Sequence, residues 1–153
     1  MNKLFALFLL VLGCPEKESS DTGDHHHHHH HGGDDTAIED GNFTTEATTE
    51  GSTWTLQYAS DPDPIVLSEN FALNVNVSNA EGPASDAALT FDATMPAHEH
   101  GMNTEASVTS NGNGSFTVTG MQFHMTGHWR LHANVSSDGQ AEEYAWFDVI
   151  CCD

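Results

Sequence analysis

Short alternations of polar and apolar residues between residues 53 and 150 constrain the fold more than any other feature. In the clearest example, Phe71, Leu73, Val75 and Val77 share one face of a strand. The run Asn111-Gly112-Asn113-Gly114 between two such segments is a strong β-hairpin signal. Seven segments are predicted as strands: Thr53–Tyr58, Phe71–Ser78, Ala87–Thr94, Ala106–Ser110, Ser115–Thr119, Trp129–Val135 and Glu143–Ile150.

Seven short strands with turn signals at regular intervals, and no helix-period segment of useful length, predict an all-β fold. We expect an immunoglobulin-like antiparallel β-sandwich of about seven strands over residues 52–153. Such a domain is large enough to bury its own core. Trp129 is expected in that core, whereas His132 alternates outward and is expected at the surface.

The first residues are typical of an export signal rather than of a fold. Lys3 precedes the apolar run Leu4–Leu12, which is too short to span a bilayer as a helix of ~20 residues. The run ends in Val11-Leu12-Gly13-Cys14, which resembles a bacterial lipobox. We therefore predict a lipoprotein signal peptide over residues 1–13, lipidation of Cys14, and an extracytoplasmic position in the cell envelope. An ordinary signal peptide with an incidental cysteine is the alternative.

Residues 14–51 are rich in Glu, Asp, Ser, Thr and Gly, and only Ile38 and Phe43 could anchor a core. Because this composition cannot offset the entropy of ordering the backbone, a disordered acidic tether is predicted there. The tether contains seven consecutive imidazoles, which bind zinc, copper or nickel with little selectivity. An affinity tag is the alternative interpretation. These accessory metal ligands are His25, His26, His27, His28, His29, His30 and His31.

The net charge of the chain limits the classes of partner that it can bind. Lys and Arg number 3 against 23 Asp and Glu, which gives a formal net charge of −20. Nucleic-acid binding needs a basic surface for phosphate contacts, and electrostatic docking on anionic lipid needs one too. We therefore expect no nucleic-acid partner and a general attraction for cations.

Two segments, Met95–Met102 and Met121–Trp129, concentrate methionine and histidine among turn-forming residues. Imidazole and thioether ligands suit copper, whereas Mg²⁺ and Ca²⁺ prefer several carboxylates. Met121, Phe123 and Met125 also recur at the strand period, so these methionines could instead fill the core; for Met125 both interpretations stay open. The predicted metal ligands are His98, His100, Met102, His124, Met125 and His128.

The same residues carry a resemblance to the YtkA-like domain. Met95–Met102, then Gly114-Ser115-Phe116, then Phe123–Leu131 resemble that family's methionine, His-Gly, Gly-aromatic and Met-x-Gly-x-Trp elements. His98, His100, Met125, Gly127 and Trp129 match the pattern, whereas His124 and His128 are additions of this chain. The resemblance covers roughly Trp54–Val149 and implies an exported immunoglobulin-like domain, similar to FixH-like and CopC-like domains, near copper-handling or respiratory-oxidase systems.

Cys151 and Cys152 are adjacent at the end of the last predicted strand. Exported thiols usually oxidise, which favours a vicinal disulfide or a bond to a partner. Neighbouring Cα atoms lie ~3.8 Å apart, below the usual ~4.4–6.8 Å of a disulfide, so a vicinal bridge would be reducible. A dithiol metal site is the alternative.

No nucleophile elbow, HExxH or phosphate loop is present, so we expect no catalytic residues and a protein that is not an enzyme. The leading hypothesis is a lipid-anchored extracytoplasmic carrier, chaperone or sequestration protein for a metal, most plausibly copper. Its expected partners are the membrane, through the lipid, and copper-handling or oxidase membrane proteins. The alternative is a non-catalytic interaction module that docks on a membrane protein and uses Met and His for packing.

Overall fold

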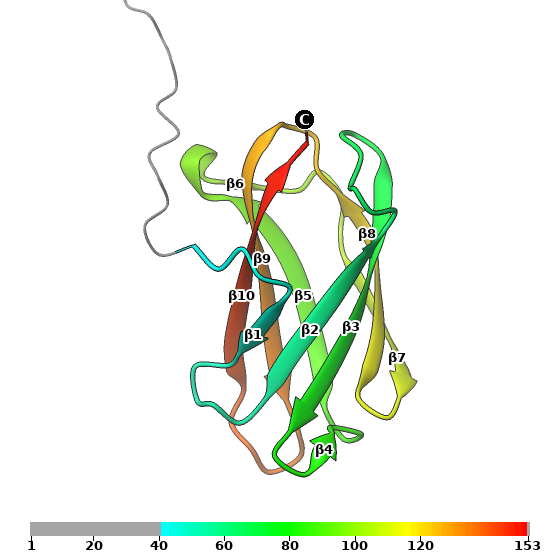
Figure 1. Cartoon of the computed structure of the whole chain (residues 1–153), viewed down its shortest axis with the longest axis vertical. Coiled ribbons are helices and arrows are strands. Elements are labelled where there is room, and N and C mark those ends of the chain that lie inside the picture. The colour runs from blue at the N-terminus through cyan, green and yellow to red at the C-terminus, as the bar shows by residue number, and fades with distance from the viewer. Residues whose placement is uncertain (1–40, 153) are drawn as a thin grey trace, which may run out of the picture. The chain divides into compact units, whose positions relative to one another are not determined.

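The computed structural model describes residues 41–152 and shows two antiparallel sheets facing each other (Figure 1). The first sheet has the strand order β1-β2-β3-β8-β7, with β4 paired to β3, and the second has the order β10-β9-β5-β6. The predicted β-sandwich is confirmed. The elements are β1 (Glu46–Thr48), β2 (Thr55–Asp61), β3 (Asn70–Asn79), β4 (Gly82–Pro83), β5 (Ala88–Met95), the 3-10 helix η1 (Pro96–His98), β6 (His100–Gly101), β7 (Ser107–Gly112), β8 (Ser115–Gln122), β9 (Gly127–Ser136) and β10 (Glu143–Cys151).

All seven predicted strands are present, as β2, β3, β5, β7, β8, β9 and β10. The sequence did not indicate β1, β4 or β6, because two or three residues are too few to show alternation. No helix among residues 41–152 is long and apolar enough to cross a membrane.

The core lies between the two sheets and follows the predicted alternation. Trp129, Leu131, Ala133 and Val135 of β9 are fully buried, which confirms Trp129 as a core residue. Met121 of β8 is also fully buried, so this methionine packs in the core. The period-two pattern therefore placed the inward faces of the long strands correctly.

The predicted hairpin joins β7 to β8. Gly112 pairs with Ser115, which leaves Asn113 and Gly114 as a two-residue turn. Both turn residues have a left-handed backbone, with φ of 53° and 70°. This conformation matches the twist of the flanking strands, and Asn-Gly adopts it at low cost.

The domain begins earlier than predicted. Strand β1 pairs with β2, and the Asn42 side chain donates a hydrogen bond to the Trp146 carbonyl at 3.1 Å. The predicted boundary at residue 52 is therefore too late, because short polar segments can add to a sheet through backbone bonds alone. The predicted signal peptide, Cys14 and the run from His25 to His31 lie outside the described residues.

Candidate metal centre

Strand β6 and the end of β8 lie at the same end of the sandwich as the end of β10 (Figure 1), and histidines from both sheets meet there. His100 lies in β6 of the second sheet, and His124 follows β8 of the first sheet. Their ring centroids are 5.0 Å apart, and the His98 ring lies 5.8 Å from that of His100. The sandwich thus brings together three of the predicted ligands from two separate loops.

The local chain path explains how His98 and His100 come to share a site. Pro96 starts the single turn of η1, and Glu99 then adopts a left-handed backbone with φ of 54°. This reversal returns the chain so that His100 pairs with Met95 across β5 and β6. The two histidines are therefore held by a tight turn, and their rings are inclined by 38°.

The hydrogen bonds of the two central rings leave nitrogen atoms free for a ligand. His100 Nδ1 lies 3.0 Å from the Gly101 carbonyl oxygen. Because a carbonyl only accepts, this Nδ1 carries the hydrogen, and the neutral ring keeps its lone pair on Nε2. The Nδ1 atom of His124 is buried without a hydrogen-bond partner, one of three such side-chain atoms among the described residues. His100 therefore has one nitrogen anchored and the other open, an arrangement common in metal-binding histidines.

Trp129 forms the wall of the site. Its ring lies 5.8 Å from His100 and 5.5 Å from His124, and it stacks on Phe123 at 4.6 Å. Its Nε1 donates to the Met125 carbonyl oxygen at 2.9 Å. The buried indole therefore fixes the loop backbone beside His124 and shields one side of the imidazoles from water.

The two predicted methionine ligands differ in their surroundings. Met102 is half-buried, and its sulfur accepts the Gln122 N–H at 3.5 Å. This places a thioether beside the end of β8, two residues before His124. Met125 leaves the strand pattern, and its side chain is 37% exposed. Of the two interpretations kept open for Met125, core filler is therefore wrong, because β8 ends at Gln122 and the alternation stops there.

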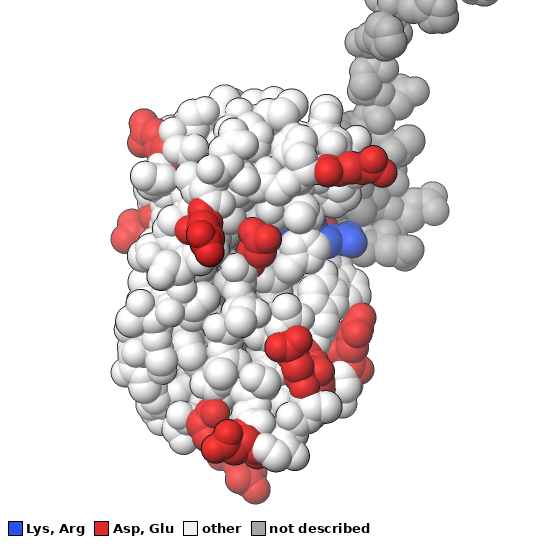
Figure 2. Space-filling model, turned by 180° about the vertical axis from the view of Figure 1, so that it is seen from behind, with Lys and Arg blue, Asp and Glu red and all other residues white. Residues whose placement is uncertain are grey.

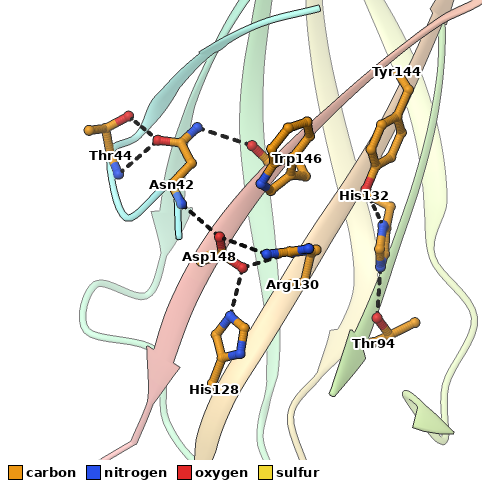
Figure 3. Close-up of polar contacts among 9 residues, drawn as sticks. All are labelled: Asn42, Thr44, Thr94, His128, Arg130, His132, Tyr144, Trp146 and Asp148. Atoms are coloured by element: carbon orange, nitrogen blue, oxygen red, sulfur yellow. Dashed lines mark hydrogen bonds and ion pairs between the residues drawn. The ribbon is translucent and has the colours of Figure 1, made fainter. Parts of the chain in front are cut away.

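His128 is not part of this cluster. It is the second residue of β9, and its side chain lies on the face of the strand opposite to that of Trp129. Its Nε2 lies 2.6 Å from Asp148 Oδ1 (Figure 3). Successive side chains of a strand point to opposite faces, so His128 and the core residue Trp129 diverge. The prediction that His128 joins the other ligands is corrected on this geometry.

The buried polar network around Asp148 was not predicted from the sequence. Arg130 Nε binds Asp148 Oδ1 at 2.9 Å, and the Asn42 backbone N–H donates to Oδ2 at 2.7 Å (Figure 3). Burial alone would raise the pKa of Asp148, but the hydrogen bonds from Arg130, His128 and Asn42 outweigh it and lower the pKa. The one available signal was that Arg130 is the sole Lys or Arg between residues 41 and 152.

His132 is also better connected than its predicted surface position suggested. Its Nε2 lies 2.7 Å from Thr94 Oγ1, and its Nδ1 lies 2.6 Å from the Tyr144 hydroxyl (Figure 3). Half-burial lowers the pKa of His132, although Asp92 partly opposes this shift. Both ring nitrogens are occupied, so His132 is not an available metal ligand.

Among the described residues, the site does not hold a full set of three His, Cys, Asp or Glu ligands. Within residues 41–152, no three His, Cys, Asp or Glu side chains are grouped closely enough to hold an ion. The donors in place are therefore imidazole nitrogens of His100 and His124, with the His98 ring next to His100 and the Met102 thioether at the end of β8. This combination suits a soft or borderline ion of low coordination number.

The described domain as a whole is acidic, because Arg130 is its sole Lys or Arg. Figure 2 shows red carboxylate side chains spread over one face of the domain, with blue confined to one small area. Arg130 is paired with Asp148, so its charge is largely compensated. The field of the described domain therefore favours the approach of cations and opposes that of anions.

Comparison with known proteins identifies the family of the chain. The family model described as YtkA-like matches residues 48–134. A crystal structure of a DUF4426 family protein from Pseudomonas aeruginosa is similar, with 13% sequence identity and a TM-score of 0.48. That similarity covers 65% of this chain and 90% of the other. No curated protein matches the chain. The chain belongs to the YtkA-like family.

Proposed function

We propose that this YtkA-like protein is a lipid-anchored, extracytoplasmic copper-binding protein that carries, delivers or sequesters the metal. The observation that carries the proposal is the pair His100 and His124, with ring centroids 5.0 Å apart and a free nitrogen on each ring. His98 lies beside His100, the Met102 sulfur contacts the Gln122 N–H at the end of β8, and both would complete the ligand set.

Copper fits these donors better than other common ions. Neutral imidazole binds both oxidation states of copper, and thioether selects Cu(I). Mg²⁺ and Ca²⁺ bind chiefly through oxygen, and none of the proposed ligands is a carboxylate. A bound copper ion would replace the missing partner of the buried His124 Nδ1, which otherwise stays desolvated at a cost.

The N-terminal features fit the same role. Lipidation of Cys14 would hold the domain at the membrane surface, and the run His25–His31 would raise the local metal concentration by tethered chelation. Copper-handling or oxidase membrane proteins are the partners that this arrangement would serve.

Fluorescence quenching by Cu²⁺ tests the proposal and separates the loop site from the histidine run. Trp129 contacts both histidines, so Cu²⁺ at the site should quench its emission. The double variant His100→Ala/His124→Ala should lose this high-affinity quenching. A full-length control with serine at positions 25 to 31 should keep it. Equal quenching of the double variant and the parent protein would contradict the proposal.

A docking module is the second candidate, and one observation favours it. A hollow of about 890 Å³ near the end of β10 is lined partly by apolar side chains, of which Val66, Leu67 and Ile150 are exposed. Retained copper binding in the double variant, together with association with a membrane protein that Ile150→Asp abolishes, would favour docking over metal transport.

A further inference from the structure

Cys151 and Cys152 form a disulfide at the end of β10, outside the histidine site. Cys151 pairs with Gly127 at the start of β9, so the disulfide lies at the end of the sandwich where the β8–β9 loop enters β9. Cys151 is 3% exposed, and Cys152 is half-buried. Both residues line the hollow of about 890 Å³.

Stabilisation of the fold does not account for this bond. A disulfide stabilises a protein mainly by closing a loop in the unfolded chain, and the effect grows with the length of that loop. The Cys151–Cys152 bond joins neighbours and closes no chain loop. The disulfide therefore contributes little to the stability of the fold, and the presence of two adjacent cysteines needs another explanation.

The surroundings of the pair suit a small soft ligand. The hollow opens to solvent and is lined by apolar side chains, among them Ile65, Val66 and Leu67, and by polar ones that include Asp63 and Thr126. Thr126 directly follows Met125, whose exposed thioether is on the same loop. Arg130 is the sole Lys or Arg of the described residues, and it is paired with Asp148. No other Lys or Arg side chain of the described residues is therefore present to neutralise the thiolates in place of a metal cation.

We propose that Cys151 and Cys152 are a redox-gated Cu(I) site, separate from the histidine site. A dithiol reductant transfers two electrons to the bond; its own two thiols become a disulfide, and their protons pass to Cys151 and Cys152. The two resulting thiols then bind one Cu(I) as thiolates and release their two protons to solvent. In the disulfide state the sulfurs are joined to each other and do not act as thiolate ligands, so reduction opens the site.

Thiolate is the side-chain donor that most favours Cu(I), and adjacent cysteines present two of them on one short segment. The proposal shares no ligand with the histidine pair. Failure of one site therefore leaves the other unaffected, and the two proposals can be tested separately.

The test compares the full chain before and after treatment with dithiothreitol, which is removed without air. Cys14 is replaced by serine throughout, so that residues 151 and 152 supply the only thiols. Cu(I) is titrated against a Cu(I) chelator, and the ultraviolet band of the copper–thiolate bond is followed. We expect the reduced protein to retain about one more Cu(I) per chain than the oxidised protein, together with that band.

The extra Cu(I) and the band should disappear in Cys151→Ser/Cys152→Ser and persist in His100→Ala/His124→Ala. Serine at the buried Cys151 also tests folding, so alkylation of the half-buried Cys152 in the reduced protein with iodoacetamide provides a second way to block the pair, and it should give the same loss. The proposal is overturned if dithiothreitol releases no thiols, or if the reduced and oxidised forms retain the same amount of Cu(I).

Discussion

His128 Nε2 lies 2.6 Å from Asp148 Oδ1, a hydrogen bond on the outer face of the second sheet, and the Asn42 backbone N–H donates to the same carboxylate. Arg130 binds the same carboxylate, so Asp148 is the shared acceptor of a buried network (Figure 3). The contact explains why one of the histidines of the Met121–Trp129 segment is absent from the metal centre. It also makes Asp148 the polar residue on which the stability of this face depends most.

Replacing Asp148 with asparagine should lower the free energy of unfolding by about 3 kcal/mol, because the amide keeps only one acceptor oxygen and has no negative charge to pair with Arg130. Urea unfolding at pH 7 measures the change. The exposed carboxylate of Asp86 provides the control: Asp86→Asn should change stability by less than about 0.5 kcal/mol. Equal values for the two variants would contradict the role given to Asp148.

The stabilisation from Asp148 should also depend on pH. Its pKa in the folded protein is lowered, so its contribution is fully present above the unfolded value of about 3.9 and is lost as the pH falls through the folded value. The difference in unfolding free energy between the parent protein and Asp148→Asn should stay constant from pH 7 to 5 and shrink below about pH 4. A difference that is unchanged at pH 3 would argue against a charged Asp148.

His132 should make the fold less stable in mild acid. Burial lowers its folded pKa, so as the pH falls through about 6.5 the unfolded chain takes up a proton that the folded protein does not. From pH 7.5 to 5.5 the parent protein should therefore lose more thermal stability than His132→Gln, measured with a chelator present. His98→Gln, at an exposed position, should behave like the parent protein.

The hairpin turn should tolerate alanine at Gly112 better than at Gly114. Both glycines have positive φ, so each alanine costs about 1 kcal/mol in backbone strain. At Gly114 a Cβ atom would also run into the Val77 carbonyl and the Ala84 amide, whereas at Gly112 it would meet open space. In thermal unfolding, the melting temperature of Gly114→Ala should be clearly lower than that of Gly112→Ala. The same melting temperature for both variants would contradict the close approach.

Met121 and Met125 both fit the period-two pattern of a strand, but their replacement by alanine should change the stability by different amounts. Met121 is fully buried, so Met121→Ala should cost about 3 kcal/mol through lost burial and an unfilled cavity. Met125 is 37% exposed, and Met125→Ala should cost less than about 0.5 kcal/mol in metal-free protein. Urea unfolding in the presence of a chelator measures both. A large loss for Met125→Ala would place that side chain in the core after all.

The sequence by itself determined the fold class, because the long strands carry enough alternating residues to mark their inward faces. It also located the β7–β8 turn, since few sequences other than Asn-Gly accept two successive positive φ values. It identified the two loops that hold the candidate ligands, because histidine and methionine beside glycine and proline are unusual at strand ends. The lipid anchor and the choice of copper remain predictions.

Only the tertiary structure decided which of those ligands meet. His100 and His124 become neighbours because β6 and the end of β8 belong to different sheets that face each other, and no local pattern records that pairing. The structure also separated His128 from Trp129, assigned Asp148 to His128 and Arg130, and brought Asn42 into the domain. These contacts depend on which strands lie side by side, and that arrangement is set by burial of the whole core rather than by any one segment.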